Sequence, residues 1–428
     1  MDREHFHEGG EDAEIDRRRA GELLDAMLER LGPMRRVLLL PPDGTRAHSG
    51  AGELTAMLHE RLAGRAHVAI MPALGTHAPM TRAEIERMFP GVPPSLFQVR
   101  CFRSGLHRLG TVPASFIRTI SEGRMEVPIA CEVDRLLVEG GWDRILSIGQ
   151  LVPHEVAGIS NHNKNLYIGA GGRDTINKTH FLGAVYGMER IMGRARSPVR
   201  AVFDYADEHL ASALPEVTYL LTVRALAAGG RLVTRGLFAG EGSACFHRGA
   251  DLCRRVNMSL LDRPLQRCVV WLDPAEYRST WLGNKAIYRT RMAMATGGEL
   301  VVLAPGVSRF GEDPGIDRLI RRHGYRGTAE TLASVGRDAE LADDLSAAAH
   351  LIHGSSEGRF TVRYAAGGLS REEVESVGFA WGDLDELVHR YEPARLQEGW
   401  TRTPGGEEIF FVSNPALGLW GLRAQFAD

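Results

Sequence analysis

The sequence has few cysteines and no long apolar run. Its five cysteines include no CxxC pair and are odd in number, so a disulfide framework or a zinc knuckle is not expected. No apolar run reaches the ~18 residues that span a bilayer. The N-terminus, MDREHFHEGGEDAEIDRRR, is too polar for a secretory signal, and its first dozen or so residues are expected to be disordered. These features favour a cytoplasmic protein with reduced thiols.

Several common catalytic and binding motifs are also missing. There is no HExxH of a zinc protease and no GxxxxGK[ST] phosphate loop. The run 169–172 (GAGG) does not match GxGxxG in a usable context. The net charge of -3 argues against a general nucleic-acid surface.

The pattern of strands and helices predicts an α/β fold with two domains. A length of 428 residues exceeds one typical domain. Buried-strand patterns at 36–40, 68–71 and 144–148 alternate with helical patterns at 16–31 and 53–62. This alternation is typical of parallel-type sheets flanked by helices, and we expect the active site in the interdomain cleft.

The domain limits follow from a second α/β alternation that starts near residue 266. We place an N-terminal catalytic domain at 1–263 and a C-terminal α/β domain at 264–404, and expect the apolar tail 405–428 to return to the first. Within the first domain, a helix is expected at 215–228 and a hairpin strand at 231–239.

The most informative stretch is 146–180. It follows a buried strand and carries three histidines and two lysines: His154, His162, His180, Lys164 and Lys178. Histidine titrates near neutral pH and ligates metals, and lysine can bond covalently to a cofactor. So many of these groups are hard to explain by packing alone.

Two further strand-end loops carry polar groups. Asp43-Gly44-Thr45-Arg46 contains an arginine suited to a carboxylate or phosphate, and His77 precedes a helix capped by Thr81 and Glu84. Each loop taken alone also suits an ordinary surface turn. Together with the 146–180 stretch, they place acid–base and anion-binding groups at one edge of a parallel sheet.

These motifs resemble those of the nickel-pincer-nucleotide lactate racemases. The family's H-x-x-A-G-[F/I]-S-x-x-x-K element stands here as 154–164, and its histidine sixteen residues later is His180. Its D-x-T-R element is 43–46, its G-x-H-x-x-x-T element is 75–81, and a lysine of its second domain best matches Lys285. The resemblance spans most of the chain.

The resemblance implies a racemase or epimerase that inverts C2 of a 2-hydroxy acid by reversible hydride transfer. Its cofactor would be nickel held by pyridinium-3,5-bisthiocarboxylic acid mononucleotide, the nickel-pincer nucleotide, attached covalently to Lys164. His180 would ligate nickel. Asp43, Thr45 and Arg173 would contact the nucleotide. His77 and His154 would act as bases on opposite faces of the substrate. Arg46 and Lys285 would bind the substrate carboxylate or stabilise its oxygen.

Departures from the family pattern bear on the substrate. Asn163 stands where the family shows an arginine, Leu282 where it shows a glutamine, and a tryptophan of lactate-specific members is missing near 344–345. A small-molecule 2-hydroxy acid other than lactate is therefore expected.

Partners and alternatives complete the interpretation. The resemblance implies proteins of cofactor synthesis as partners for maturation; neither nucleic acid nor a membrane is expected. Two alternatives stay open: a nickel-independent nicotinamide-type oxidoreductase or isomerase, and a non-catalytic protein that binds the nickel nucleotide.

Overall fold

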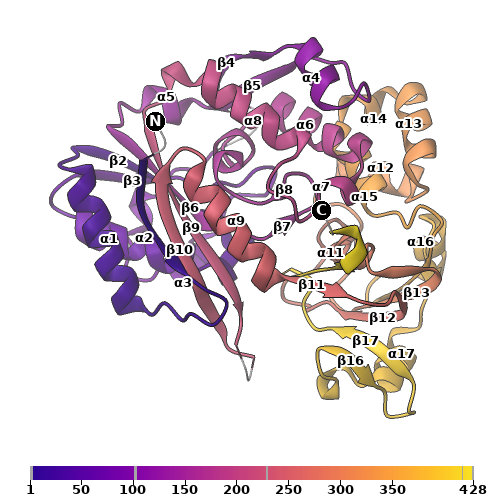
Figure 1. Ribbon diagram of the computed structural model, residues 1–428. Coiled ribbons are helices and arrows are strands. Elements are labelled where there is room, and N and C mark those ends of the chain that lie inside the picture. Colours follow the sequence, from indigo (N-terminus) through magenta and orange to yellow (C-terminus); the bar gives the residue numbers. More distant parts are fainter. Residues whose placement is uncertain (1–2, 101–103, 228–229, 417, 427–428) are drawn as a thin grey trace. The chain divides into compact units, whose positions relative to one another are not determined.

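The chain folds into two units (Figure 1). The computed structural model describes residues 3–100, 104–227, 230–416 and 418–426. The first unit comprises Met1–Leu182 and Ile191–Asn257, and the second comprises Gly183–Arg190 and Met258–Asp428. The predicted α/β class is confirmed, because each unit holds a sheet with parallel strands and flanking helices.

The first unit contains a six-stranded sheet in the order β1-β10-β9-β6-β2-β3. Strands β9, β6, β2 and β3 run parallel, whereas β10 and β1 are antiparallel additions at one edge. The apolar runs predicted as buried strands lie in the parallel part, which helices cover on both faces. The strands are β1 (Arg3–Gly9), β2 (Arg36–Leu40), β3 (His67–Ile70), β6 (Arg144–Gln150), β9 (Glu216–Leu226) and β10 (Leu232–Glu241).

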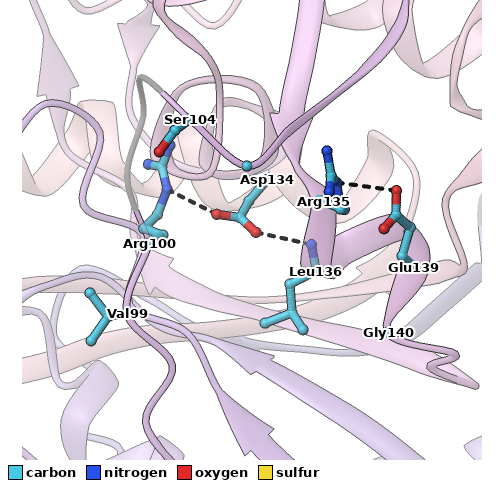
Figure 2. Close-up of a pocket in the computed structure, with 9 residues that line it drawn as sticks. Val99, Arg100, Ser104, Asp134, Arg135, Leu136, Glu139 and Gly140 are labelled. Atoms are coloured by element: carbon cyan, nitrogen blue, oxygen red, sulfur yellow. Dashed lines mark hydrogen bonds and ion pairs between the residues drawn. The ribbon is translucent and has the colours of Figure 1, made fainter.

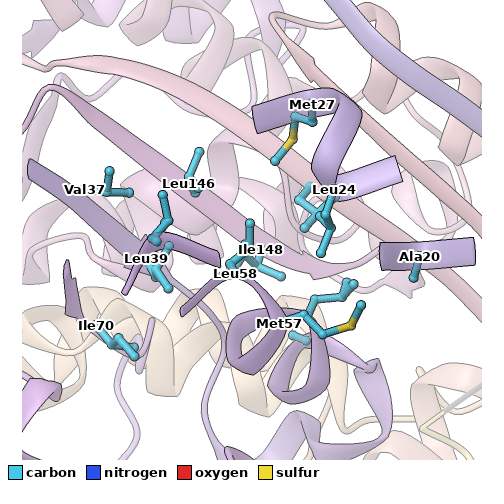
Figure 3. Close-up of a cluster of buried hydrophobic side chains, with 14 of the residues drawn as sticks. Ala20, Leu24, Met27, Val37, Leu39, Met57, Leu58, Ile70, Leu146 and Ile148 are labelled. Carbon is cyan, nitrogen blue, oxygen red and sulfur yellow. The ribbon is translucent and has the colours of Figure 1, made fainter. Parts of the chain in front are cut away.

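Helices α1 (Arg17–Leu31) and α2 (Ala51–Leu62) cover one face of this sheet. The Asp16 side chain caps α1 by accepting from the backbone N–H of Arg19. Figure 3 shows α1 and α2 side chains packed on β2, β3 and β6. On β10, Leu237 joins this core, while its neighbour Phe238 lies against α9 (Ala244–Asn257) on the other face.

Two expectations for the first unit are wrong. The expected helix at 215–228 is strand β9, whose buried run from Thr218 to Val223 lies between β6 and β10. Its β-branched and aromatic residues suit a strand, and the sheet outweighs the helix-start signal of Pro215. The N-terminal residues expected to be disordered form β1, which pairs with β10.

The second unit contains a sheet in the order β15-β14-β13-β12-β17-β16. All neighbours are parallel except β16 and β17. The strands are β12 (Leu265–Trp271), β13 (Met294–Ala304), β14 (Thr361–Ala366), β15 (Ala380–Trp381), β16 (Gly399–Arg402) and β17 (Glu408–Val412). The helices are α10 (Thr280–Gly283), α11 (Lys285–Thr290), α12 (Pro314–His323), α13 (Thr328–Arg337), α14 (Ala339–Asp343), α15 (Leu345–His353), α16 (Arg371–Ser376) and α17 (Leu384–Tyr391).

The C-terminal tail stays in the second unit. Strand β17 pairs with β12, and β18 (Leu419–Leu422) pairs with β11 (Met258–Leu261). The expectation that 405–428 returns to the first domain is therefore wrong, because β17 completes a sheet of its own unit. The boundary lies between Asn257 and Met258, close to the predicted position at 263.

Two properties of the described residues bear on the class of protein. The cysteines among them are buried, namely Cys131, Cys245, Cys253 and Cys268, and Cys101 lies outside the described residues. None of the described helices has the length and apolar character needed to cross a membrane.

Candidate functional site

The first candidate residues lie just after β2. Asp43 begins the short 3-10 helix η1 (Gly44–Ser49) and accepts a hydrogen bond from the backbone N–H of Thr45 at 2.9 Å. Its other oxygen, Oδ2, lies 2.6 Å from Nδ1 of His77. The Asp43 side chain is 5% exposed and that of His77 28% exposed. A buried carboxylate thus holds a histidine that reaches solvent.

The charge state of Asp43 follows from these contacts. Burial alone would raise the pKa of its carboxyl, but the charge and hydrogen bond of His77 and the hydrogen bond of Thr45 outweigh burial and lower the pKa to about 2. Asp43 is therefore an anion throughout the physiological pH range.

His154 lies in a small hairpin made by β7 (Pro153–His154) and β8 (Gly158–Ile159). Its Nδ1 accepts hydrogen bonds from the backbone N–H groups of Val156 at 3.1 Å and Ala157 at 3.4 Å. Its Nε2 is 3.8 Å from a carboxylate oxygen of Glu155. This buried ring is thus fixed by its own turn.

Lys164 follows a strained turn. Asn161 and His162 both have left-handed backbones, with φ of 59° and 60°, which non-glycine residues rarely adopt. Glycine at 149 leaves room for the turn, because a side chain there would overlap the Asn161 amide. Lys164 then begins the π-helical turn η3 (Asn165–Gly169). Such turns often accompany functional positions.

The surroundings of Lys164 make its amine more reactive than an ordinary lysine. Burial lowers the pKa of Lys164, and the positive charges of Arg46 and Arg200 lower it further. The negative charges of Glu155 and Asp43 oppose this shift only in part, so the resulting pKa is about 8. A larger fraction is therefore the neutral, nucleophilic amine near neutral pH. The same charges place Lys164 in the electrostatic environment of the 43–46 loop.

Hydrogen bonds hold three strand-end segments together. The backbone N–H of Gly75, two residues before His77, donates to the carbonyl of Gly169 at 2.9 Å. The Asn165 side-chain amide donates to the carbonyl of Leu40 at 3.0 Å and to the hydroxyl of Ser147 at 3.1 Å. The structure thus brings the predicted 43–46, 75–81 and 154–164 segments together, as expected for ends of neighbouring parallel strands.

Arg173 and His180 lie on helix α6 (Arg173–Tyr186), so the end of the 146–180 stretch is helical rather than a loop. Nδ1 of His180 lies 2.7 Å from the carbonyl oxygen of Ile176, which can only accept, so Nδ1 carries the proton. The Nε2 lone pair of neutral His180 is thereby of the kind that binds a metal. Among the described residues, no group of three or more His, Cys, Asp or Glu side chains could hold a metal ion, so a metal there would need ligands from elsewhere.

Lys285 belongs to the second unit, where it begins α11 and is buried, with its ammonium 5.5 Å from the centre of the Tyr277 ring. Its predicted contact with the substrate, like the interdomain location of the active site, stays a prediction.

Two further residues of the 146–180 stretch have structural roles. His162 packs on the Tyr219 ring at a centroid distance of 3.9 Å, and its Nε2 lies 2.8 Å from the Gly242 carbonyl. Burial and the charge of Arg200 lower its pKa to about 3, so it is neutral. The ammonium of Lys178 pairs with Asp174 at 2.7 Å. Neither residue is needed to explain the site.

The sequence reasoning missed the buried arginine Arg200 of α8 (Pro198–His209). It donates to the carbonyl of Ile159 at 2.7 Å and to the side chain of Asn163. Asn163 in turn donates to the carboxylates of Asp204 at 2.9 Å and Asp207 at 2.8 Å. A buried arginine from another helix thus contacts Asn163, the residue that stands where the family pattern shows an arginine. The i, i+4, i+7 spacing of Arg200, Asp204 and Asp207 could have indicated this face.

Arg100 was also missed, because its carbonyl partners at Gly75, Gly169 and Gly171 are distant in sequence. Its guanidinium donates to the carbonyls of Gly171 at 2.6 Å and Gly75 at 3.3 Å, and also to that of Gly169. It therefore ties the loop before His77 to the segment after Lys164. Arg100 is only 4% exposed, so these hydrogen bonds are shielded from water.

A cavity of about 470 Å³ is lined in part by Arg100, and none of the predicted site residues lines it. Figure 2 shows Arg100 beside Asp134, with Arg135 and Glu139 forming a second ion pair in the lining. Its charges are mixed in sign, which gives no preference for one ligand class. The candidate site therefore rests on the three strand-end segments.

Comparisons with known proteins give a family match and a fold. Residues 24–191 match the family described as lactate racemase N-terminal domain. A crystal structure of a protein from Thermotoga maritima has a TM-score of 0.83 and 23% identity, covering 97% of this chain and 100% of that chain. The lactate racemase apoprotein from Thermoanaerobacterium thermosaccharolyticum has a TM-score of 0.66 and 18% identity, covering 90% of this chain and 87% of that chain. No curated protein matches the sequence. At these identities the two structures show a shared fold.

Proposed function

We propose, from the premise that residues 24–191 belong to the lactate racemase N-terminal domain family, that this protein is a racemase or epimerase of a 2-hydroxy acid other than lactate. One observation carries the proposal. The three segments that resemble the family's motifs meet at one sheet edge, where the Asp43–His77 pair shares its surroundings with the activated amine of Lys164.

The residues present fit the nickel-pincer nucleotide that the resemblance implies. The lowered pKa of Lys164 suits a covalent bond to the cofactor, and the Nε2 lone pair of His180 suits nickel. Asp43, Thr45 and Arg173 would contact the nucleotide. When bound, this group would supply reversible acceptance of hydride from C2 of the substrate, which avoids a carbanion.

The chain's own residues would bind the acid and move its hydroxyl proton. Arg46 offers a planar guanidinium for the substrate carboxylate, and Lys285 would contribute a second positive charge. His77, held by the Asp43 carboxylate, can accept a proton on Nε2. His154 would contact the substrate oxygen from a buried position. Proteins of cofactor synthesis would act before catalysis, to load Lys164.

Mass spectrometry and racemisation assays on one preparation test the proposal. Protein co-produced with nickel-pincer synthesis proteins should carry nickel and a mass increment on Lys164, and should erase the optical purity of one acid from a panel of chiral 2-hydroxy acids. Lys164→Ala should lose the increment, whereas the control Lys178→Ala should keep it. An increment that survives in Lys164→Ala rejects the assignment. Loading without turnover of any acid would favour a nickel-nucleotide binding protein, and turnover without nickel the nicotinamide-type alternative.

A further inference from the structure

The strand order of the second sheet changes direction between β12 and β17. Strands β12, β13, β14 and β15 follow one another to one side, whereas β17 and β16 lie on the other side of β12. β12 and β17 are parallel, so the loops that follow them leave from the same edge of the sheet. Such a switch in strand order is the place where open α/β sheets usually bind ligands.

Tyr277 and Asn414 meet at this switch point. Tyr277 lies in the loop after β12, and its hydroxyl donates to Oδ1 of Asn414, in the loop after β17, at 3.1 Å. The same Oδ1 accepts from the backbone N–H of Ala416 at 2.8 Å. The backbone N–H of Tyr277 donates to the carbonyl of Asp273 at 2.9 Å. The tyrosine is therefore fixed at both its backbone and its hydroxyl, and it is only 2% exposed.

Gly306 allows the tyrosine loop to pack closely against its neighbour. A side chain at this position, in the loop after β13, would place its Cβ 2.8 Å from the carbonyl oxygen of Tyr277 and 2.7 Å from Cα of Pro274. Both are backbone atoms in a closely packed region and cannot move aside as the end of a flexible side chain can. The loops that follow β12, β13 and β17 thus support one another at this edge.

Lys285 lies over the ring of Tyr277. Its ammonium is 5.5 Å from the ring centre, within the ~6 Å range of a cation–π contact. Lys285 is buried, and burial disfavours the charged form of an amine. The face of the ring offsets part of this effect, because its negative face attracts an ammonium more strongly than a neutral amine.

We propose that Tyr277 is a positioning residue: its ring, anchored to the C-terminal tail through Asn414, holds the Lys285 ammonium charged and in place for the carboxylate or oxygen of the acid. This inference rests on the proposed function, in which Lys285 contacts the substrate. It gives the C-terminal tail a part in positioning that lysine. A ring that only filled space would have no effect on the charge of Lys285, so the two roles can be separated.

The first test measures the charge of Lys285 in the apoprotein. Lysine labelled with ¹³C at Cε gives one NMR signal for each of the three lysines, and Lys285→Arg assigns the signal of Lys285. Tyr277→Phe keeps the ring face, whereas trifluorophenylalanine at the same position keeps nearly the same shape but loses most of the negative charge on that face. We expect the titration midpoint of Lys285 to be about 0.4–1.5 pH units lower with the fluorinated ring than with phenylalanine.

Two controls accompany this comparison. The midpoints of Lys164 and Lys178, in the first unit, should be unchanged. The same pair of substitutions at Tyr391, a buried ring of α17 that packs in the apolar cluster with Val269, should leave the midpoint of Lys285 in place. Equal midpoints of Lys285 with the two rings at position 277 would overturn the proposal, whatever reaction the protein catalyses.

The second test uses the loaded protein and the acid that the wild type turns over, at a pH between the two midpoints of Lys285. The fluorinated ring should raise KM relative to Tyr277→Phe and change kcat less, because Lys285 contacts the acid before the reaction as well as during it. Asn414→Leu, which removes the anchor of the tyrosine hydroxyl, should also raise KM. An unchanged KM with the fluorinated ring would overturn the positioning role. If the wild type turns over no 2-hydroxy acid, the proposed function fails, while the NMR midpoints still decide whether the ring holds the ammonium charged.

Discussion

The segments on the two sides of Lys164 are each held by a buried arginine, but in different ways. On the N-terminal side, Arg200 contacts the 159–163 turn within a network that includes the carboxylates of Asp204 and Asp207. On the C-terminal side, Arg100 donates to the carbonyls of Gly169 and Gly171, and its guanidinium lies 3.9 Å from the Asp134 carboxylate. Arg200 thus lies in a network with two carboxylates, whereas the short hydrogen bonds of Arg100 link distant stretches of backbone.

This difference separates two ways of positioning a reactive lysine. In the charge-balanced network, loss of the buried cation removes its hydrogen bonds and leaves two neighbouring carboxylates without a positive charge, so the cost depends on pH. In the backbone link, loss of the cation leaves unpaired carbonyls, which is cheaper and nearly independent of pH, but it also releases the loop that carries His77.

The largest effect is expected for Arg200→Met. It removes the donor to the carbonyls of Ile159 and Asn161 and the cation beside Asp204 and Asp207, which are themselves exposed, and we expect a loss of about 3 kcal/mol of unfolding free energy. Chemical denaturation near pH 8 measures this cost. Arg291→Met is a matched control for loss of a buried arginine away from this segment, because Arg291 is similarly buried in the second unit, bonds the carbonyl of Ser355 at 3.1 Å and pairs with Glu189 at 3.0 Å.

The pH dependence of this variant sharpens the comparison. Desolvation of its hydrogen-bonded carboxyl raises the pKa of Asp207 to about 6, although the residue as a whole is exposed and hydrogen bonds from Tyr167 and Asn163 oppose the shift. A carboxyl with a raised pKa binds more protons in the folded state, so its contribution to stability falls as pH rises from about 4 through 6. Without Arg200 the pKa of Asp207 rises further, and we expect stability to keep falling above pH 6. Equal slopes for variant and wild type between pH 6 and 8 would contradict the charge-balancing role.

A smaller loss of about 1–3 kcal/mol is expected for Arg100→Met, because carbonyls at Gly75, Gly169 and Gly171 lose donors. This loss should change little between pH 6 and 8. Hydrogen exchange should increase at Gly75, whose N–H bonds Gly169. A loss as pH-dependent as that of Arg200→Met would show that the two arginines act alike.

A change of Arg46 should alter the pKa of the Lys164 amine rather than the stability of the fold. Burial and the charge of Arg46 lower its pKa to about 8, so acylation of the apoprotein should be half-maximal near that pH. The chain has only three lysines, at 164, 178 and 285, so mass spectrometry can follow each one. Arg46→Gln should move the midpoint of Lys164 upward and leave the Lys178 profile in place. An unmoved Lys164 midpoint would show that Arg46 does not tune this amine.

The smallest effect is expected for Lys178→Met. Its ammonium pairs with Asp174 at the partly exposed surface of α6, and such pairs contribute about 0–1 kcal/mol. Thermal unfolding should show a correspondingly small change. A loss of unfolding free energy comparable to that of Arg100→Met would mean that this surface ion pair stabilises the segment as much as a buried arginine does.

The sequence predicted those parts of the structure that depend on local pattern. The strands at 36–40 and 144–148, the α1 helix and the Thr81–Glu84 capping box follow from periodicity and capping residues, and all are confirmed. The meeting of Asp43, His77 and Lys164 followed from the rule that parallel strands end at one edge. Contacts between distant segments were not predictable, because nothing near Arg100 in sequence indicates the carbonyls of Gly75 and Gly171. Strand β9 was misread because its place in the sheet outweighs local helix signals.

Strand β1 has a consequence for the protein's tendency to aggregate. It occupies the edge of the first sheet beside β10, an apolar strand whose outer hydrogen-bonding groups would otherwise be open to another chain. β1 itself is short, irregular between Glu4 and Phe6, and rich in charged residues, which are features that discourage further pairing. Removal of residues 1–9 should therefore increase self-association through β10, measurable by light scattering, so any shortened form should retain this strand.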